Sequence, residues 1–185
     1  MFTHISGVSI PTAMFPKVAV VGGGITGACV ASLLSNTFDV KVDLFDQGRR
    51  GPGGRASHRI EQEKRWDHGC QFFRADTQSF LSHVNEWIQK GYCMEYKGKF
   101  GSNHSDADFF GFPSKPPFFI GIEGMTTVVD RLLNDCPSET FSLHAGQRVS
   151  SILRDPQTQE WTIFGTGGEA AYHDTPEAMA SKAEY

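Results

Sequence analysis

A glycine pattern near the start of the chain constrains the fold more than any other feature. The pattern G-x-G-x-x-G occupies residues 22–27 and follows a short β-branched run at residues 17–21. Residues 25–35 are small and apolar, which predicts a helix, and residues 40–45 predict a second buried strand. This order and spacing are typical of a βαβ unit with parallel strands.

Each residue of the pattern has a physical task in such a unit. Gly22 allows a tight turn out of the strand, Gly24 lets a pyrophosphate approach the backbone, and Gly27 lets the helix pack closely. The first helical residues, Ile25 and Thr26, belong to a helix end that offers free N–H groups and partial positive charge to phosphates. The pattern therefore predicts a dinucleotide site.

A carboxylate supports this interpretation. Asp46 ends the second predicted strand, 19 residues after Gly27. An acid at this place is expected to accept hydrogen bonds from the ribose hydroxyls of an adenosine, and we include its neighbour Gln47 in the predicted site. The negative charge disfavours a 2′-phosphate, so NADP is not expected here. A glycine-rich turn without any ligand is the alternative.

Two further segments follow the aspartate. Gly53, Gly54 and Arg55 form a glycine-rich element in which the backbone can lie flat against a ligand and the arginine can supply a cation to a pyrophosphate. The run Arg49-Arg50 before it could reach the adenosine or phosphates, or be solvated. Residues 67–73 then read DHGCQFF, a compact aromatic segment without a clear period.

Taken in this order, the motifs resemble the N-terminal part of the flavin-containing amine oxidase superfamily, and among its members the renalase-like FAD/NAD(P)-binding oxidoreductases. The resemblance covers about residues 17–164. It implies an α/β, Rossmann-type FAD/NAD(P)-binding domain with a parallel sheet, whose C-terminal substrate half is missing. It also implies that Gly69, Cys70 and Gln71 lie near the isoalloxazine ring of FAD, and that the backbone of Val149 contacts the adenine end.

The resemblance implies an FAD-dependent oxidoreductase of the amine oxidase or renalase-like kind. Two electrons would pass as a hydride from an amine or a reduced nicotinamide to the flavin, and oxygen would reoxidise the flavin. FAD is the expected cofactor and NAD(P)H a candidate substrate, while the catalytic residues stay unknown. A non-catalytic dinucleotide-binding fragment or short isoform is the alternative. An NAD(H)-dependent dehydrogenase domain is a third, against which the segments at residues 53–55 and 67–73 argue.

Several side chains have two interpretations. His68 is either a proton relay or a turn histidine, and Cys70 is either a redox or flavin-linked thiol or a small lining residue. Asp67 is either a base or a carboxylate that holds its loop through backbone N–H groups. Five phenylalanines could wall an apolar substrate pocket or be simple core: Phe109, Phe110, Phe112, Phe118 and Phe119.

The remaining elements are expected from periodicity. A helix should follow an N-cap at Asp76 and end at Gly91, with one apolar face made of Phe80, Leu81, Val84, Trp87 and Ile88. A second helix is predicted over residues 124–134. Strands are predicted over residues 149–153 and 161–164, joined by a turn.

The ends of the chain read differently. Residues 1–16 are interpreted as a disordered lead-in, residues 17–164 as the incomplete FAD-binding domain, and residues 165–185 as a polar tail and truncation point. The net charge of −4 and the absence of a basic face disfavour nucleic-acid binding, and no apolar run approaches the ~20 residues of a membrane span.

The number and spacing of the cysteines give an indication of the cellular compartment. The four cysteines show no CxxC spacing, so no metal site is expected, and low cysteine content favours a reducing compartment such as the cytoplasm. An organelle address stays open. The expected partner is a small-molecule substrate, and the oligomeric state cannot be predicted.

Overall fold

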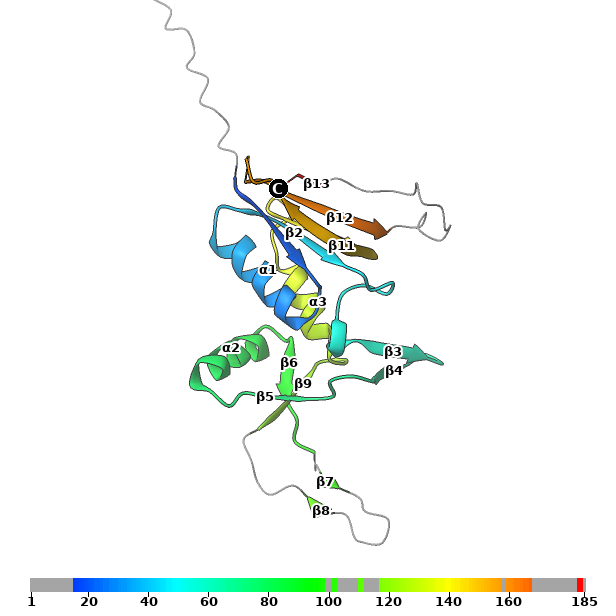
Figure 1. Cartoon of the computed structure of the whole chain (residues 1–185). Helices are drawn as coiled ribbons and strands as arrows, with labels where there is room; N and C mark the ends of the chain where they lie inside the picture. The colour runs from blue at the N-terminus through cyan, green and yellow to red at the C-terminus, as the bar shows by residue number, and fades with distance from the viewer. Residues whose placement is uncertain are drawn as a thin grey trace, which may run out of the picture.

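The computed structural model describes residues 15–98, 101–102, 110–111, 117–157, 159–167 and 183–184. Its centre is a parallel sheet in the order β1 (Lys17–Val21), β2 (Lys41–Asp46), β10 (Phe141–Ala145), shown in Figure 1. The helix α1 (Ile25–Thr37) joins β1 to β2. The predicted βαβ unit is confirmed, and with it the Rossmann-type fold class with its parallel sheet.

The register of this sheet places its functional edge. Val21 pairs with Phe45, and Ala145 pairs with Asp46, so the three strands end at one level. Because parallel strands put their carboxyl ends at the same edge, the glycine turn after β1 and the carboxylate of Asp46 become neighbours. The third parallel strand, β10, was missed by the sequence analysis.

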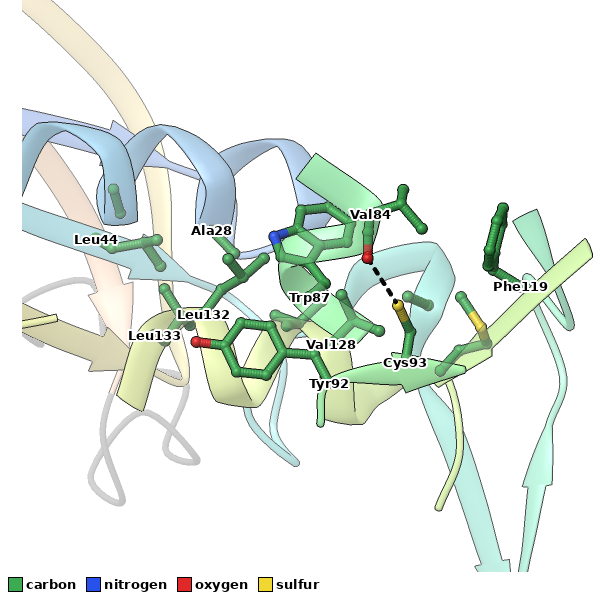
Figure 2. Close-up of a cluster of buried hydrophobic side chains, with 14 of the residues drawn as sticks. Ala28, Leu44, Val84, Trp87, Tyr92, Cys93, Phe119, Val128, Leu132 and Leu133 are labelled. Carbon is green, nitrogen blue, oxygen red and sulfur yellow. Dashed lines mark hydrogen bonds between the residues drawn. The ribbon is translucent and has the colours of Figure 1, made fainter. Parts of the chain in front are cut away.

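The sheet packs against two helices that lie side by side, α1 and α3 (Thr126–Asn134). The inward residues predicted for the second of these helices are confirmed as buried: Met125, Val128, Val129, Leu132 and Leu133. Figure 2 shows Leu132 and Leu133 near Ala28 of α1 and Leu44 of β2. Burying one such aliphatic side chain stabilises the fold by about 1.5–3 kcal/mol.

A second layer extends the core away from the parallel sheet. It combines α2 (Gln78–Gln89) with a small antiparallel sheet in the order β5 (Phe73–Arg74), β9 (Phe118–Gly121), β6 (Cys93–Glu95). Phe119 is buried in this layer, so it belongs to the core. Phe118 is half-buried, and Phe109 and Phe112, together with the side chain of Phe110, lie outside the described part.

The start and the apolar face of α2 differ from the prediction. The N-cap is Thr77, whose side-chain oxygen accepts a hydrogen bond of 3.2 Å from the N–H of Phe80. Asp76 instead forms an ion pair with Arg74. Its carboxylate lies one residue before the N-cap and faces the guanidinium rather than the first turn of the helix. Ile88 is 37% exposed and so lies at the rim of the buried face, whereas Val84 and Trp87 are buried. Gly91, at φ 73°, follows the helix as predicted.

Three more sheets and a 3-10 turn complete the described structure. A hairpin of β3 (His58–Glu61) and β4 (Lys64–Asp67) projects from the body after the 3-10 turn at Gly54–Ala56. β7 (Gly101–Ser102) and β8 (Phe110–Gly111) form a short antiparallel pair. A further antiparallel sheet holds β11 (Gln147–Arg154), β12 (Trp161–Gly167) and β13 (Ala183–Glu184).

The predicted hairpin near the C-terminus is confirmed by β11 and β12, and β12 continues to Gly167. Of the predicted lead-in, residues 1–14 lie outside the described part, while the carbonyl of Pro16 accepts a hydrogen bond from Lys41 N–H. Most of the predicted polar tail, residues 168–182 and 185, also lies outside it. Among the helices of the described part, none has the length and apolar character to cross a membrane.

Candidate functional site

The glycine turn is built as the sequence predicts. Gly22 has a φ of 102°, a conformation that side chains disfavour, and its N–H donates to the carbonyl of Phe45 at 2.8 Å. A Cβ atom added at Gly27 would clash with the carbonyl oxygen of Gly22. A Cβ at Gly24 would meet only the Cα of Gly54, at 4.0 Å. The backbone is therefore packed tightly at Gly27 and open at Gly24.

The N-terminus of α1 lacks a protein cap. Its N-cap residue is Gly24, no described side chain accepts a hydrogen bond there, and the first turn carries no acidic residue. The free N–H groups and the partial positive charge of a helix N-terminus attract anions. An oxygen-rich anionic ligand, such as a pyrophosphate, would satisfy this end.

Asp46 is clamped by backbone groups. Its Oδ2 accepts a hydrogen bond of 2.8 Å from the N–H of Gly23, its Oδ1 accepts one of 2.8 Å from the N–H of Gly48, and the residue is 8% exposed. An ionised carboxylate has about four acceptor positions, so roughly half of its capacity remains. The aspartate thus fixes the glycine turn as well as lining the site.

The second glycine segment is joined directly to the first. The N–H of Gly53 donates to the carbonyl of Gly23 at 2.8 Å, and Gly24 and Gly53 form a parallel bridge. A Cβ at Gly54 would lie 3.2 Å from the Cα of Gly24. The close approach therefore depends on the missing side chain of Gly54, and the two motifs act as one backbone surface.

The third segment is attached to the second. The N–H of Cys70 donates to the carbonyl of Arg55 at 2.7 Å, and a Cβ at Gly69 would clash with that same carbonyl. The guanidinium of Arg55 is exposed and has no hydrogen-bond or ion-pair partner within the described residues. An unpaired cation is thereby available beside the glycine turn.

A histidine and two polar residues anchor α3 to these loops. Asp67 accepts hydrogen bonds from the N–H of Met125 on both carboxylate oxygens, each at 3.1 Å, which confirms that it holds its loop through backbone N–H groups. The hydroxyl of Thr126 donates to the carbonyl of Ala56 at 2.9 Å, and lies 2.7 Å from Nδ1 of His58. These contacts join residues 58 to 70 positions apart, so no sequence spacing could reveal them.

Two pockets flank the joined loops. The first, here called the glycine-turn pocket, has a volume of about 890 Å³ and is mainly apolar. It is lined by Val20, Val21, Gly22, Gly24, Ile25, Thr26, Gly27, Val30, Gly53, Arg55, Ala56, Gly69, Cys70, Phe73, Phe80, Trp87, Met125 and Val128. Nine residues of the predicted site therefore meet in one cavity.

The second cavity, here called the Asp46 pocket, has a volume of about 700 Å³. It is lined by Asp46, Gln47, Gly48, Arg49, Arg50, Gly51, Pro52, Gly54, Ser57, His58, Ile60, His68 and Thr126. Three predicted residues, Asp46, Gln47 and Gly54, belong here. The structure does not bring Gln71 or Val149 into the lining of either pocket.

His68 and Cys70, whose roles the sequence leaves open, lie in different pockets. His68 lines the Asp46 pocket, with Nε2 at 3.4 Å from the hydroxyl of Ser57, while Cys70 lines the glycine-turn pocket. The thiol of Cys70 donates to the carbonyl of Phe72 at 3.0 Å. All four cysteines are free thiols. Burial raises the pKa of Cys93 to about 11 and also raises the pKa of Cys29 and of Cys136.

The parallel sheet, the glycine turn and α1 together make a Rossmann-like fold. The family model described as "NAD(P)-binding Rossmann-like domain" matches residues 20–87, which include the glycine turn, Asp46 and both following loops.

Solved structures share the fold. A putative protoporphyrinogen oxidase from Exiguobacterium sp. 255-15 superposes with a TM-score of 0.58 at 11% identity, over 81% of this chain and 56% of that one. A p-nitrophenol 4-monooxygenase from Pseudomonas putida DLL-E4 gives 0.54 at 18% identity, over 92% of this chain and 38% of that one. The chain thus spans about two fifths to just over half of these structures.

Proposed function

We propose that the chain is the FAD-binding part of an FAD-dependent oxidoreductase. One observation carries the proposal: a continuous set of backbone contacts joins the glycine turn, Arg55 and the loop at Gly69 and Cys70 around a single cavity. A domain that binds only the ADP part of a dinucleotide such as NAD needs the glycine turn but not Arg55 or the loop at Gly69 and Cys70. The two further loops extend the surface toward a larger, partly apolar group such as a flavin ring.

The residues present fit FAD. The pyrophosphate would lie against the uncapped N-terminus of α1, where Gly24 leaves the backbone open and Arg55 supplies a cation. The adenosine would extend toward Asp46 and Gln47, where the carboxylate keeps free acceptor positions. The flavin end would lie toward Gly69 and Cys70. When bound, FAD supplies two-electron redox chemistry, while the protein supplies position and electrostatics.

The reaction class follows from the order of motifs in the sequence. The resemblance to renalase-like and amine oxidase proteins supports oxidation of an amine or of a reduced nicotinamide, with dioxygen as the final electron acceptor. We propose residues 17–164 as the FAD-binding unit.

A direct test is titration of the full 185-residue chain with FAD, followed by flavin fluorescence and visible absorbance. Stoichiometric binding that Arg55→Gln weakens supports the proposal, with Arg59→Gln, on the projecting hairpin and outside both pockets, as the matched control. A chain that binds NADH in preference to FAD would contradict it.

One observation favours a second candidate, a dinucleotide-binding module without catalysis. Of the described strands only β2 pairs with β1, whose last residue Val21 is 50% exposed, and Val30 and Leu33 on α1 are 41% and 59% exposed. An apolar edge of this kind needs a partner surface. Turnover of NADH with release of hydrogen peroxide by the chain alone would exclude this candidate.

A further inference from the structure

We propose that the Asp46 pocket contains a binding site for a phosphate group, formed by Arg50, His58, His68 and the hydroxyl of Ser57. The site goes beyond the proposed flavin function, because it uses neither the glycine turn nor Arg55. Its ligand is a phosphorylated small molecule whose phosphate enters on the side of the β3–β4 hairpin.

The charge balance of the pocket is the first observation. Arg49, Arg50, His58 and His68 line it, and Asp46 is the acid among the described lining residues. That acid does not offset the cations well, because it is 8% exposed and directs both oxygens at backbone N–H groups. The open part of the pocket therefore presents positive charge and hydrogen-bond donors, which suits an anion.

The bonding of His58 is the second observation. Thr126 has one hydroxyl proton and donates it to the carbonyl of Ala56, so toward His58 it can only accept. Nδ1 of His58 must then carry a proton. Protonation of the ring therefore changes only Nε2. This atom accepts a hydrogen bond when the ring is neutral and donates one to an anion when the ring is protonated.

The free groups around this histidine are the third observation. The exposed guanidinium of Arg50 has no hydrogen-bond or ion-pair partner within the described residues, and the hydroxyl of Ser57 has only the long 3.4 Å contact with His68. A guanidinium, two imidazoles and a hydroxyl lining one pocket match the several acceptor oxygens of a phosphate. A neutral adenosine would leave these donors unpaired.

Other ionisable groups also act on His58. Asp67 lies opposite it in the hairpin register, with both oxygens accepting from Met125 N–H. Asp130 on α3 interacts electrostatically with His58 and with Arg65; burial raises the pKa of this aspartate, and the two cations oppose that rise. An anion beside the imidazole ring and a proton on that ring attract each other, so the two should bind cooperatively.

Calorimetric titration of the full chain with sulfate tests the site, because sulfate keeps two charges across the pH range whereas phosphate does not. We expect sulfate to bind more tightly at pH 5.5 than at pH 8, and inorganic phosphate to compete with it. Arg50→Gln should weaken binding roughly tenfold, the equivalent of about 1.4 kcal/mol. Because two imidazoles line the site, His58→Gln should reduce the pH dependence, and His58→Gln combined with His68→Gln should remove it.

Two matched variants separate this site from other cationic places. Arg55→Gln alters the glycine-turn pocket, and Arg59→Gln alters a hairpin residue that lines neither pocket. Arg59→Gln should bind sulfate like the original chain, whereas Arg55→Gln should affect only an anion held at the glycine turn. If Arg55→Gln removes binding and Arg50→Gln does not, the anion lies at the glycine turn and the inference is overturned. Equal losses in all variants, or no binding at all, overturn it too.

Folding of the variants is checked by circular dichroism. If His58→Gln does not fold, the imidazole resonances of the original chain decide, since sulfate must shift those of His58 and His68. Unshifted resonances contradict the site.

Discussion

The Oδ2 atom of Asp46 lies 2.8 Å from the backbone nitrogen of Gly23, and this hydrogen bond ties the end of β2 to the glycine turn that follows β1. The same carboxylate also accepts from Gly48. A residue expected mainly to bind a ribose therefore also shapes the turn on which the pyrophosphate would rest. The predicted binding role and the observed structural role therefore fall on the same residue.

Replacing this aspartate should lower stability. Asp46→Ala leaves two N–H groups without their charged acceptor, and hydrogen bonds to charged groups contribute about 1.5–3 kcal/mol each. We expect the free energy of unfolding in urea to fall by roughly 3 kcal/mol. Asp46→Asn keeps one acceptor oxygen and should lose less. Equal stability of Asp46→Ala and the original chain would contradict the clamp.

Two glycines of the turn should respond in opposite ways. At Gly27 a Cβ would clash with the carbonyl of Gly22, so Gly27→Ala should destabilise the fold by about 1–3 kcal/mol. At Gly24 a Cβ meets nothing nearer than 4.0 Å, so Gly24→Ala should stay folded. Because its methyl group would occupy the approach to the backbone, Gly24→Ala should bind FAD at least tenfold more weakly. Urea unfolding and FAD titration measure the two effects, and a reversed pattern would refute the assignment of roles.

The N-cap of α2 gives a local test. Thr77→Ala removes the oxygen that accepts from Phe80 N–H and should cost about 1 kcal/mol of unfolding free energy. Asp76→Ala removes only an exposed ion pair with Arg74 and should change stability by less than about 1 kcal/mol. Thermal unfolding of both variants compares them. A larger loss in Asp76→Ala would show that the aspartate is the cap after all.

The thiol of Cys93 should be slow to react. Its residue is buried, and burial raises its pKa from the ordinary 9.0 to about 11. Since the thiolate is the reactive form, alkylation by iodoacetamide should stay slow at pH 8 and accelerate only as pH rises toward 11. Mass spectrometry of the labelled chain measures this. Rapid labelling of Cys93 at pH 8 in the folded chain would contradict the burial.

Much of the core fold follows from local pattern. The strand at residues 17–21, the glycine turn and α1 were predictable because a buried parallel strand, three glycines and a small-residue helix each leave a clear local signal. The inward face of α3 was predictable from its 3.6-residue period. Asp67 was predictable as a loop-holding carboxylate, although its partner Met125 was not.

Other elements gave little local signal. The β3–β4 hairpin turns at Gln62 and Glu63, which adopt φ of 48° and 65° without the Asn or Gly that normally marks such a turn. Strand β10 lies at residues 141–145, where FSLHA alternates apolar and polar residues over only five positions, a short period-2 signal that the sequence analysis missed. The Thr126 contacts depend on tertiary packing across 68 and 70 residues, which no local pattern encodes.

The most direct test of the account is FAD binding by the full chain and by Gly24→Ala, measured by flavin fluorescence with circular dichroism as the check on folding. We predict one FAD per chain for the original protein, and a folded Gly24→Ala variant whose affinity is at least tenfold lower. If the original chain binds no FAD, or if Gly24→Ala binds it equally well, the glycine turn is not a pyrophosphate cradle and the proposed flavin site is wrong.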